Sequence, residues 1–381
     1  MSANELILTN ASIVLADRVV KGTLTVKGEI IAGIDEGVSQ LPSAIDCEGD
    51  LVLPGLIELH TDNFERHMMP RPGTAWPVRS AALSDDRELA ASGITTVFNA
   101  ICVGEVHTRS VRSGMVAEIA RAIDDHIVAG TLKIDHYFHW RCEVSYPGLP
   151  DLLDPLIDNP RLRLISVMDH TPGQRQFVDG ARYAEYYQGK YQMTDAELAE
   201  FMRTRRRDAE LYSDSNRRYV VEAAHARGVP LASHDDATAA HVDEAIADRV
   251  SVAEFPTTLE AARASHRAGL AVLMGGPNIV RGQSHSGNIS ALELARAGAL
   301  DIVSSDYVPA ALLWGAMKLV SEADMPLAVA VATVTRNPAR AVGFTDRGEI
   351  APGLRADLIR VRQFDGLPVI RDVWCLGRKV A

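Results

Sequence analysis

The spacing of apolar and polar residues changes twice along the chain. From residue 1 to residue 53, short runs rich in β-branched residues are separated by turn signals at Lys27-Gly28, Gly33 and Glu48-Gly49, which predicts short strands. From residue 54 onward, continuous apolar runs alternate with helix-like stretches, and after residue 345 the short-strand pattern returns. We therefore predict a small β-domain built from residues 1–53 and 345–381, beside a larger α/β unit of residues 54–344.

The α/β unit contains repeated apolar runs of strand length, at residues 55–60, 94–100, 133–140, 162–170, 229–235, 251–255, 270–276 and 301–306. Continuous apolar strands separated by helices indicate a parallel sheet covered on both faces. Eight such units predict a closed (β/α)₈ TIM-type barrel, whereas the alternative, an open doubly wound sheet, would not need eight. The small domain is predicted to be a β-sandwich, and a charged helical insertion at about residues 177–225 is predicted to lie over the barrel mouth.

The composition of the chain limits the compartments in which the protein could act and the partners that it could bind. The 381 residues are 47% hydrophobic and 23% charged, with a net charge of −11, which argues against a nucleic-acid-binding protein. No apolar run approaches the roughly 18 residues of a membrane helix, and MSANELILTN does not resemble a signal peptide. The four cysteines form no CxxC pair. We expect a cytoplasmic protein that binds neither membrane nor nucleic acid, and a homo-oligomer is left open.

Imidazoles and carboxylates collect where the predicted strands end, at His60, Asp62, Glu143, His170, His234 and Asp306. The carboxyl ends of barrel strands form the catalytic face of this fold. A single histidine there is commonly just a hydrogen-bonded residue, and a single aspartate is commonly a helix cap. The joint pattern favours a divalent metal site, which would lower the pKa of a bound water and polarise the bond under attack.

Candidate anion-binding residues lie in two loops. The segment MGGPNIVRGQSHSGN (274–288) combines glycines with Arg281, Ser284 and His285 and could bind phosphate oxygens, although an ordinary loop explains its composition equally well. Arg66, His67 and Arg71 follow the first barrel strand. The sequence has no Walker A motif, so phosphate binding would not use a P-loop.

Several segments carry a family resemblance. PGLIELHTD (54–62), SSD (304–306), TRNPA (335–339) and GEIAPGLRADLI (348–359) resemble the amidohydrolase superfamily over essentially the whole chain. The longer segments HTDNFERHMMPRPGTAWP (60–77), MDHTPGQRQF (168–177), SHDDAT (233–238) and AEFPTTLEAA (253–262) are similar to its diphosphatases of the carbon–phosphorus lyase pathway. This resemblance implies a metal-dependent hydrolase that converts α-D-ribose 1-methylphosphonate 5-triphosphate, a phosphorylated small molecule, to the 5-phosphate and diphosphate.

The resemblance also implies roles for individual residues. His60 and Asp62 would occupy the metal positions of the first strand, Glu143 would bridge two metals, and His170 and His234 would hold the second metal. Asp306 would bind metal and orient or deprotonate the attacking water. From the negative charge of a triphosphate, and not from the resemblance, we hypothesise that the substrate-binding set is His67, Arg66, Arg71, Arg281, Ser284 and His285.

The first-strand motif departs from the pattern of the superfamily. The usual His-x-His is His60-Thr61-Asp62 here, and a carboxylate in place of an imidazole could favour Mn²⁺ or Mg²⁺ over Zn²⁺. We expect one or two divalent ions, with zinc favoured. The alternative functions are hydrolysis of a cyclic amide, deamination of a heterocycle on the same scaffold, and a non-catalytic scaffold barrel.

Overall fold

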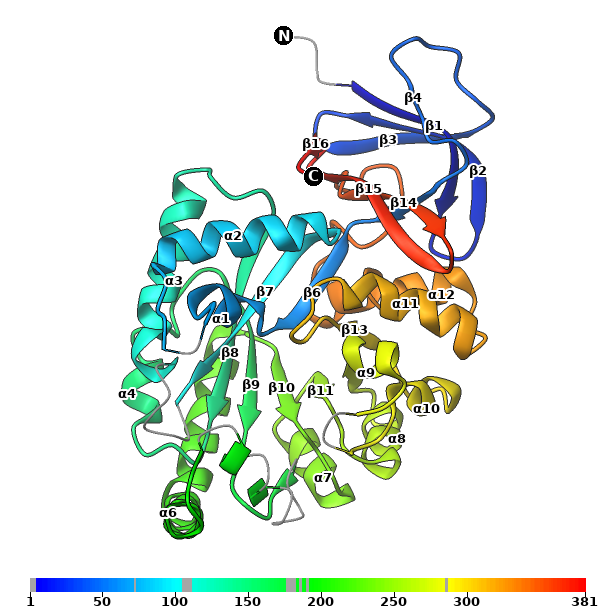
Figure 1. Ribbon diagram of the computed structural model, residues 1–381. Helices are drawn as coiled ribbons and strands as arrows, with labels where there is room; N and C mark the ends of the chain where they lie inside the picture. The colour runs from blue at the N-terminus through cyan, green and yellow to red at the C-terminus, as the bar shows by residue number, and fades with distance from the viewer. Residues whose placement is uncertain are drawn as a thin grey trace.

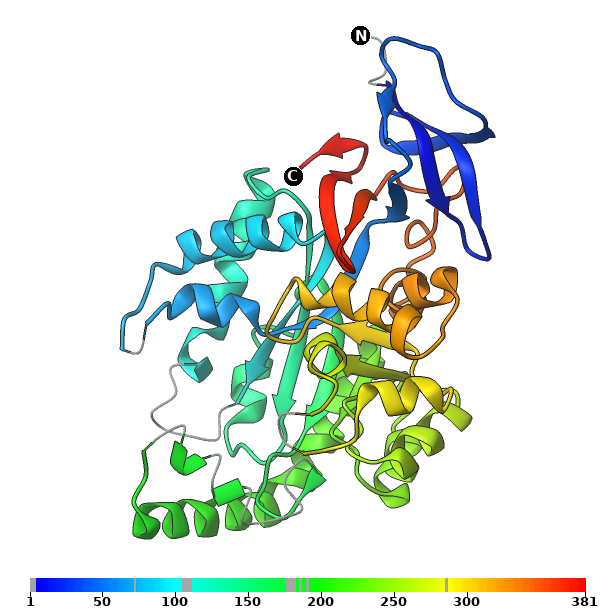
Figure 2. The same cartoon turned by 45° about the vertical axis from the view of Figure 1, so that its right-hand side comes forward.

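Two sheets organise the computed structural model of the protein (Figure 1). The structure describes residues 5–71, 73–104, 112–175, 183–184, 187–189, 192–284 and 287–381. One sheet is a parallel barrel surrounded by helices, and the other is a mixed sheet at one end of the molecule, near both chain termini (Figures 1 and 2). None of the described helices is both long and apolar enough to cross a membrane.

Both ends of the chain contribute to the mixed sheet. Its strands are β1 (Glu5–Val14), β2 (Val19–Lys27), β3 (Ile30–Glu36), β4 (Ile45–Asp46), β5 (Leu51–Pro54), β14 (Leu358–Phe364), β15 (Leu367–Cys375) and β16 (Arg378–Lys379). β5 joins the two ends because it pairs in parallel with β1 and antiparallel with β14. The strands belong to one continuous hydrogen-bonded sheet, with Leu8, Leu24 and Trp374 in its core. The exact domain boundaries stay a prediction.

The barrel consists of eight strands in sequence order, which confirms the predicted fold. They are β6 (Leu56–Thr61), β7 (Ile94–Val103), β8 (Asp135–Glu143), β9 (Leu162–Met168), β10 (Leu231–His234), β11 (Val252–Glu254), β12 (Ala271–Gly275) and β13 (Ile302–Ser304). Every residue of β6 and β7 is buried, because one face points into the barrel and the other packs against helices. Ile57, Phe98 and Leu164 belong to the apolar cluster that fills the interior.

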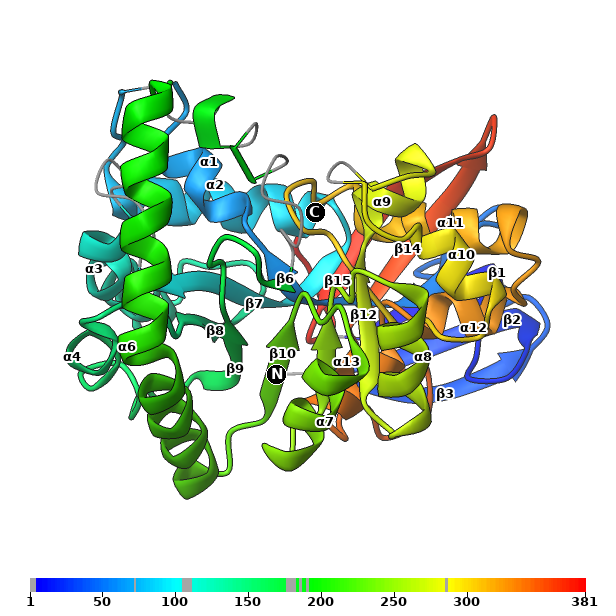
Figure 3. The same ribbon diagram turned by 90° about the horizontal axis from the view of Figure 1, so that it is seen from below.

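Helices follow most barrel strands and cover the outside of the barrel. They are α1 (Asn63–Met68), α2 (Val78–Ala91), α3 (Arg112–Val128), α4 (Leu149–Leu153), α6 (Asp195–Arg227), α7 (Ala239–Ala247), α8 (Leu259–Arg267), α9 (Gly276–Arg281), α10 (Ala291–Arg296), α11 (Ala311–Glu322), α12 (Leu327–Ala332) and α13 (Arg336–Ala341). Figure 3 views the molecule from below, the direction in which β9 and β10 point in Figure 1, and shows α6 running along one side.

Helix α6 makes up most of the described part of the predicted insertion. A capping box between Thr194 and Glu197 fixes its start, and Gly228 ends it in the left-handed conformation with φ 64°. The helix is anchored beside the end of β8, where the Asn216 amide donates to the Val144 and Tyr146 carbonyls, each at 2.8 Å. That the whole insertion covers the barrel mouth stays a prediction.

Candidate metal centre

The point where the barrel closes carries three of the predicted site residues. The Asp62 amide donates to the Asp306 carbonyl at 2.7 Å, and the Asp306 amide donates to the His60 carbonyl at 3.1 Å. Asp306 has a left-handed backbone with φ 56°, a conformation that aspartate tolerates better than most residues. These bonds join the carboxyl ends of the first and last barrel strands. They hold His60, Asp62 and Asp306 at one edge of the mouth.

Three histidines from different strands meet at this mouth. The rings of His60 and His234 stack with their centroids 5.7 Å apart, and the rings of His170 and His234 meet edge-on at 5.6 Å. His60 and His234 are buried, and His170 is nearly so. The structure therefore brings together the three imidazoles that the sequence placed at separate strand ends.

Carboxylates engage the Nδ1 atoms of these histidines. His60 Nδ1 lies 2.9 Å from Glu254 Oε1, and His170 Nδ1 lies 2.7 Å from Glu143 Oε2. His234 Nδ1 faces the other oxygen of Glu254 at the longer distance of 3.5 Å. When Nδ1 donates its proton to a carboxylate, the lone pair is left on Nε2, which is how metal-binding histidines are commonly oriented.

Asp235 completes a group of metal-binding type. Its Oδ2 atom lies 3.6 Å from His234 Nε2 and 3.8 Å from His170 Nε2. That oxygen is buried and accepts no hydrogen bond from the described part of the chain. One donor atom from each of His170, His234 and Asp235 lies within 4.8 Å of the others, so this group could hold a metal ion. Two imidazole nitrogens and a carboxylate oxygen suit a divalent transition metal.

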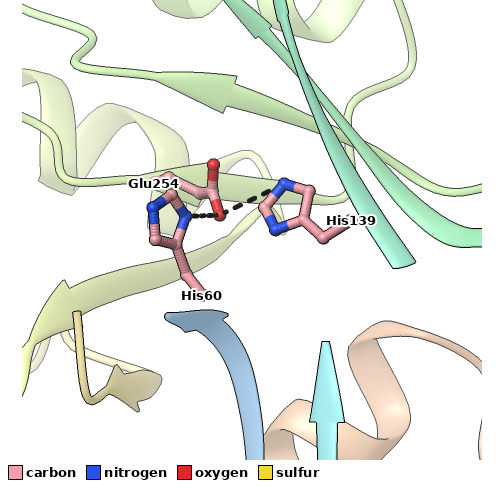
Figure 4. A group of neighbouring side chains, drawn as sticks. All are labelled: His60, His139 and Glu254. Carbon is pink, nitrogen blue, oxygen red and sulfur yellow. Dashed lines mark hydrogen bonds and ion pairs between the residues drawn. The ribbon is translucent and has the colours of Figure 1, made fainter. Parts of the chain in front are cut away.

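A second group, His60, His139 and Glu254, has similar spacing but a different character (Figure 4). His139 Nδ1 donates to the Leu59 carbonyl at 2.9 Å, and its Nε2 lies against the Ser166 hydroxyl. Burial lowers the pKa of His139 to about 3, so its ring is neutral. Both ring nitrogens of His139 are thus engaged within the barrel. This group is best described as a hydrogen-bonded support beneath His60.

Glu254 is the centre of that support. Burial opposes its ionisation, yet His60 holds the pKa of Glu254 well below its usual range. The Ser166 hydroxyl lies 2.5 Å from its Oε2 atom. Glu254 is therefore a buried anion that faces both His60 and His234. Glu254, Asp235 and His139 were not among the predicted site residues, although Asp235 follows His234 directly and Glu254 ends the sixth barrel strand.

Two predicted metal ligands already have other partners. Glu143 accepts from the His170 amide at 3.1 Å in addition to its Nδ1 contact, and it also meets Ser145 and Arg205. Asp62 forms an ion pair with Arg141. Asp306 is less constrained, and burial together with the Asp62 charge raises its pKa to about 6. The assignment of Glu143, Asp62 and Asp306 as ligands stays a prediction.

The described residues of the predicted substrate-binding set lie on α1, on α9 and in the segments that follow these helices. Arg66 and His67 lie on α1, and both pair with Glu88 of α2. Arg71 lies exposed in the segment after α1, whereas Arg281 is exposed at the end of α9 and precedes Ser284. His285 lies outside the described residues. Their role in substrate binding stays a prediction.

A cavity of about 400 Å³ opens beside the histidines, between α6 and the segment after β9. Asp169 and Thr171, which flank His170, line it. Its buried Arg175 is committed to Asp236 and Glu244, and Arg217 is committed to Glu244 and Asp248. The cavity is therefore close to the candidate metal centre, but most of its positive charge is already neutralised.

Comparison with known proteins identifies the family of the chain. The family model described as "Amidohydrolase family" matches residues 51–380. The chain is 44% identical over 377 residues to the α-D-ribose 1-methylphosphonate 5-triphosphate diphosphatase of Escherichia coli (strain K12), covering 98% of this chain and 100% of that protein.

Solved structures share the fold at low sequence identity. N-acetyl-D-glucosamine-6-phosphate deacetylase from Mycobacterium smegmatis aligns with a TM-score of 0.64 at 16% identity, over 99% of this chain and 100% of that one. Dihydropyrimidinase from Brevibacillus agri NCHU1002 aligns with a TM-score of 0.63 at 14% identity, over 99% and 95% of the two chains. From the family match and the full-length similarity to the diphosphatase, the chain belongs to the amidohydrolase family.

Proposed function

We propose that this protein hydrolyses α-D-ribose 1-methylphosphonate 5-triphosphate to the 5-phosphate and diphosphate, using a divalent metal. The observation that carries the proposal is the 44% identity with a diphosphatase of that activity over the whole length of both chains. The convergence of His60, His170, His234 and Asp235 at the barrel mouth supports metal dependence. The reaction would place the protein in phosphonate catabolism.

The donor atoms fit a divalent ion. His170, His234 and Asp235 would hold it, with His60 and Asp306 nearby at the barrel closure. A bound ion would lower the pKa of a coordinated water and polarise the phosphoanhydride bond. Zinc suits the imidazole-rich set, and manganese or magnesium is the alternative suggested by its carboxylates.

The protein's own residues would supply the remaining steps. Asp306 lies at the mouth, where its carboxylate could orient the attacking water and accept its proton. Arg66, Arg71, Arg281, His67, Ser284 and His285 are proposed to face the triphosphate. Positive side chains in these loops would compensate the charge that develops on the leaving diphosphate. All four cysteines are buried and outside any disulfide, which is in keeping with the proposed cytoplasmic setting.

Product analysis tests the proposal. Metal-reconstituted protein is mixed with a ribose 5-triphosphate that bears a 1-phosphonate, and the products are separated. We expect equimolar 5-phosphate and diphosphate, and we expect a chelator to abolish their release. Orthophosphate as the sole inorganic product would place the cleavage at another bond and contradict the proposal.

A second outcome would redirect the assignment. If the metal-loaded protein left the triphosphate intact and hydrolysed a cyclic amide or deaminated a heterocycle, the family membership would stand and the proposed substrate would be wrong. Running the reaction in ¹⁸O-labelled water would show which product receives the oxygen of the attacking water, and hence which phosphorus is attacked.

A further inference from the structure

Arg141 contributes a positive charge to the candidate metal centre. The proposed function gives this residue no role. Arg141 lies on β8, between His139 and Glu143, and is 8% exposed. Residues at every second position of a strand point to the same face, so the three side chains share the interior of the barrel. Arg141 Nη1 lies 2.5 Å from Asp62 Oδ1, while its Nε is buried without a hydrogen-bond partner among the described residues.

The charge of Arg141 acts on the whole cluster. It interacts electrostatically with His60, His170 and His234. It interacts in the same way with the Asp306 carboxylate. The Arg141 guanidinium, held against Asp62, therefore places a fixed positive charge at the mouth.

Two aspartates at the mouth differ in how their charge is balanced. Asp62 is paired with the Arg141 guanidinium. Asp235 has no arginine or lysine partner among the described residues, and its Oδ2 atom faces the Nε2 atoms of His170 and His234. A divalent ion placed against Asp235 would gain an uncompensated carboxylate, whereas an ion placed against Asp62 would have to displace or oppose a fixed positive charge.

We propose that Arg141 takes the place of a second divalent ion, so that the protein binds one ion at His170, His234 and Asp235. The guanidinium then supplies the fixed positive charge beside Asp62, and Asp62 positions the guanidinium without binding metal. A planar guanidinium can also hydrogen-bond two phosphoryl oxygens at once. The catalytic meaning of this arrangement rests on the proposed function, but the number of bound ions does not.

Metal counting tests the proposal without any substrate. The protein is stripped with a chelator, reconstituted with excess Mn²⁺ and dialysed, and the metal content per chain is measured by mass spectrometry. We expect one Mn²⁺ per chain and the six-line electron paramagnetic resonance spectrum of an isolated ion. Two Mn²⁺ per chain with an exchange-coupled spectrum would overturn the proposal, whether or not the protein cleaves the triphosphate.

A matched pair of variants tests the role of Asp62. In Asp62→Asn, which keeps the shape of the side chain, we expect the Mn²⁺ dissociation constant to stay within about threefold of the wild type. In His170→Ala, the control, we expect affinity to fall by more than about 100-fold because a metal-binding nitrogen is lost. A loss of tenfold or more in a folded Asp62→Asn variant would show that Asp62 binds the ion. The wild-type metal count decides the matter if that variant does not fold.

Discussion

Charged residues are buried at both ends of the barrel, but only at one end do the negative and positive side chains compensate each other. At the amino ends of the strands, which we call the floor, Asp135 lies 3.0 Å from Arg347 Nη1 and 2.7 Å from Arg355 Nη1. The Arg347 guanidinium also lies over the Phe344 ring, at 4.4 Å from its centroid. The two arginines outweigh the effect of burial and lower the pKa of Asp135. The floor is thus a closed ionic network.

At the mouth, the carboxylates outnumber the cations. Asp62 has Arg141, but Asp235 has an unpaired buried oxygen, and burial together with Asp62 raises the pKa of Asp306 to about 6. Burying charge without a partner is costly, so such an arrangement persists where a ligand restores the balance. A cation is therefore needed at the mouth, where a buried carboxylate lacks a partner, and not at the floor, where Asp135 already has two arginines.

Removing His170 should have the largest effect. His170→Ala deletes one of the two imidazoles in the group that could hold the ion, and we expect kcat/KM for the triphosphate to fall by about 1,000-fold. Initial rates of diphosphate release at saturating Mn²⁺ or Zn²⁺ would measure this. Activity within tenfold of the wild type would contradict the placement of the ion.

Glu254 should rank second, because its carboxylate hydrogen-bonds His60 and faces His234 without belonging to the His170 group. Glu254→Gln can still accept a hydrogen bond from one imidazole, but it loses the negative charge that faces both. We expect metal affinity to fall by about 10- to 100-fold, and Glu254→Asp to recover part of it. Isothermal titration calorimetry of the metal-free proteins measures both. An unchanged affinity in Glu254→Gln would mean that its charge is not needed to orient the histidines.

A substitution at the floor should lower the stability of the protein without changing its affinity for metal. Asp135→Asn leaves Arg347 and Arg355 without their shared carboxylate, and we expect a loss of about 2 kcal/mol in the free energy of unfolding. The pKa of Asp135 is lower in the folded protein than in the unfolded chain. The Asp135 carboxylate therefore contributes fully to the free energy of unfolding above the unfolded pKa near 3.8, and this contribution is lost as the pH falls through the pKa of the folded protein. The difference from wild type should therefore be constant from pH 6 to 8 and shrink below pH 4.

Urea denaturation at several pH values, with metal titration of the same samples, tests the Asp135 prediction. Asp135→Asn should keep the wild-type metal affinity. A weaker affinity would mean that the two ends of the barrel are coupled, which would break the comparison.

A change at Asp85 should have the smallest effect on stability, and it should stabilise the protein where the change at Asp135 destabilises it. Asp85 is fully buried on α2, it accepts a hydrogen bond from Asn63 at 2.7 Å, and its second oxygen has no hydrogen-bond partner among the described residues. Burial raises its pKa to about 6. Since the folded protein binds this proton more tightly than the unfolded chain does, stability should fall as pH rises from about 4 to about 6.

Asp85→Asn removes the charge and should flatten this dependence. We expect the variant to be more stable than wild type by about 1 kcal/mol at pH 8, with little difference at pH 4. Chemical denaturation at the two pH values measures this. A variant that is less stable at pH 8 would show that Asp85 is charged and paired in the folded protein, and that an isolated buried carboxylate is not the reason for the raised pKa.

The sequence predicted the architecture and part of the site for physical reasons. Continuous apolar runs identify strands that are buried on both faces, and residues at the carboxyl ends of such strands must converge in a barrel, so His60, His170 and His234 could be found. The alternation along β8 also puts His139, Arg141 and Glu143 on one face, a signal that was available and not used.

Charge pairing could not be predicted in the same way. Arg141 and Asp62 are 79 positions apart, and nothing local shows that they meet. The same holds for Arg66 and His67, which look free in the sequence but share Glu88 of the neighbouring helix. Which carboxylate has a cation partner depends on how elements approach one another, and that decides which carboxylate is left for a metal.

The closure of the barrel has a consequence for how the protein loses its activity. The two hydrogen bonds between the Asp62 and Asp306 segments are a seam between the first and last strands. The seam amides belong to Asp62 and Asp306, which lie at the edge of the mouth beside His60, so opening of the seam would displace these side chains from the centre. Amide hydrogen exchange at Asp62 and Asp306 therefore reports on the integrity of the active centre. An ion bound nearby would stabilise the closed barrel and slow both exchanges together.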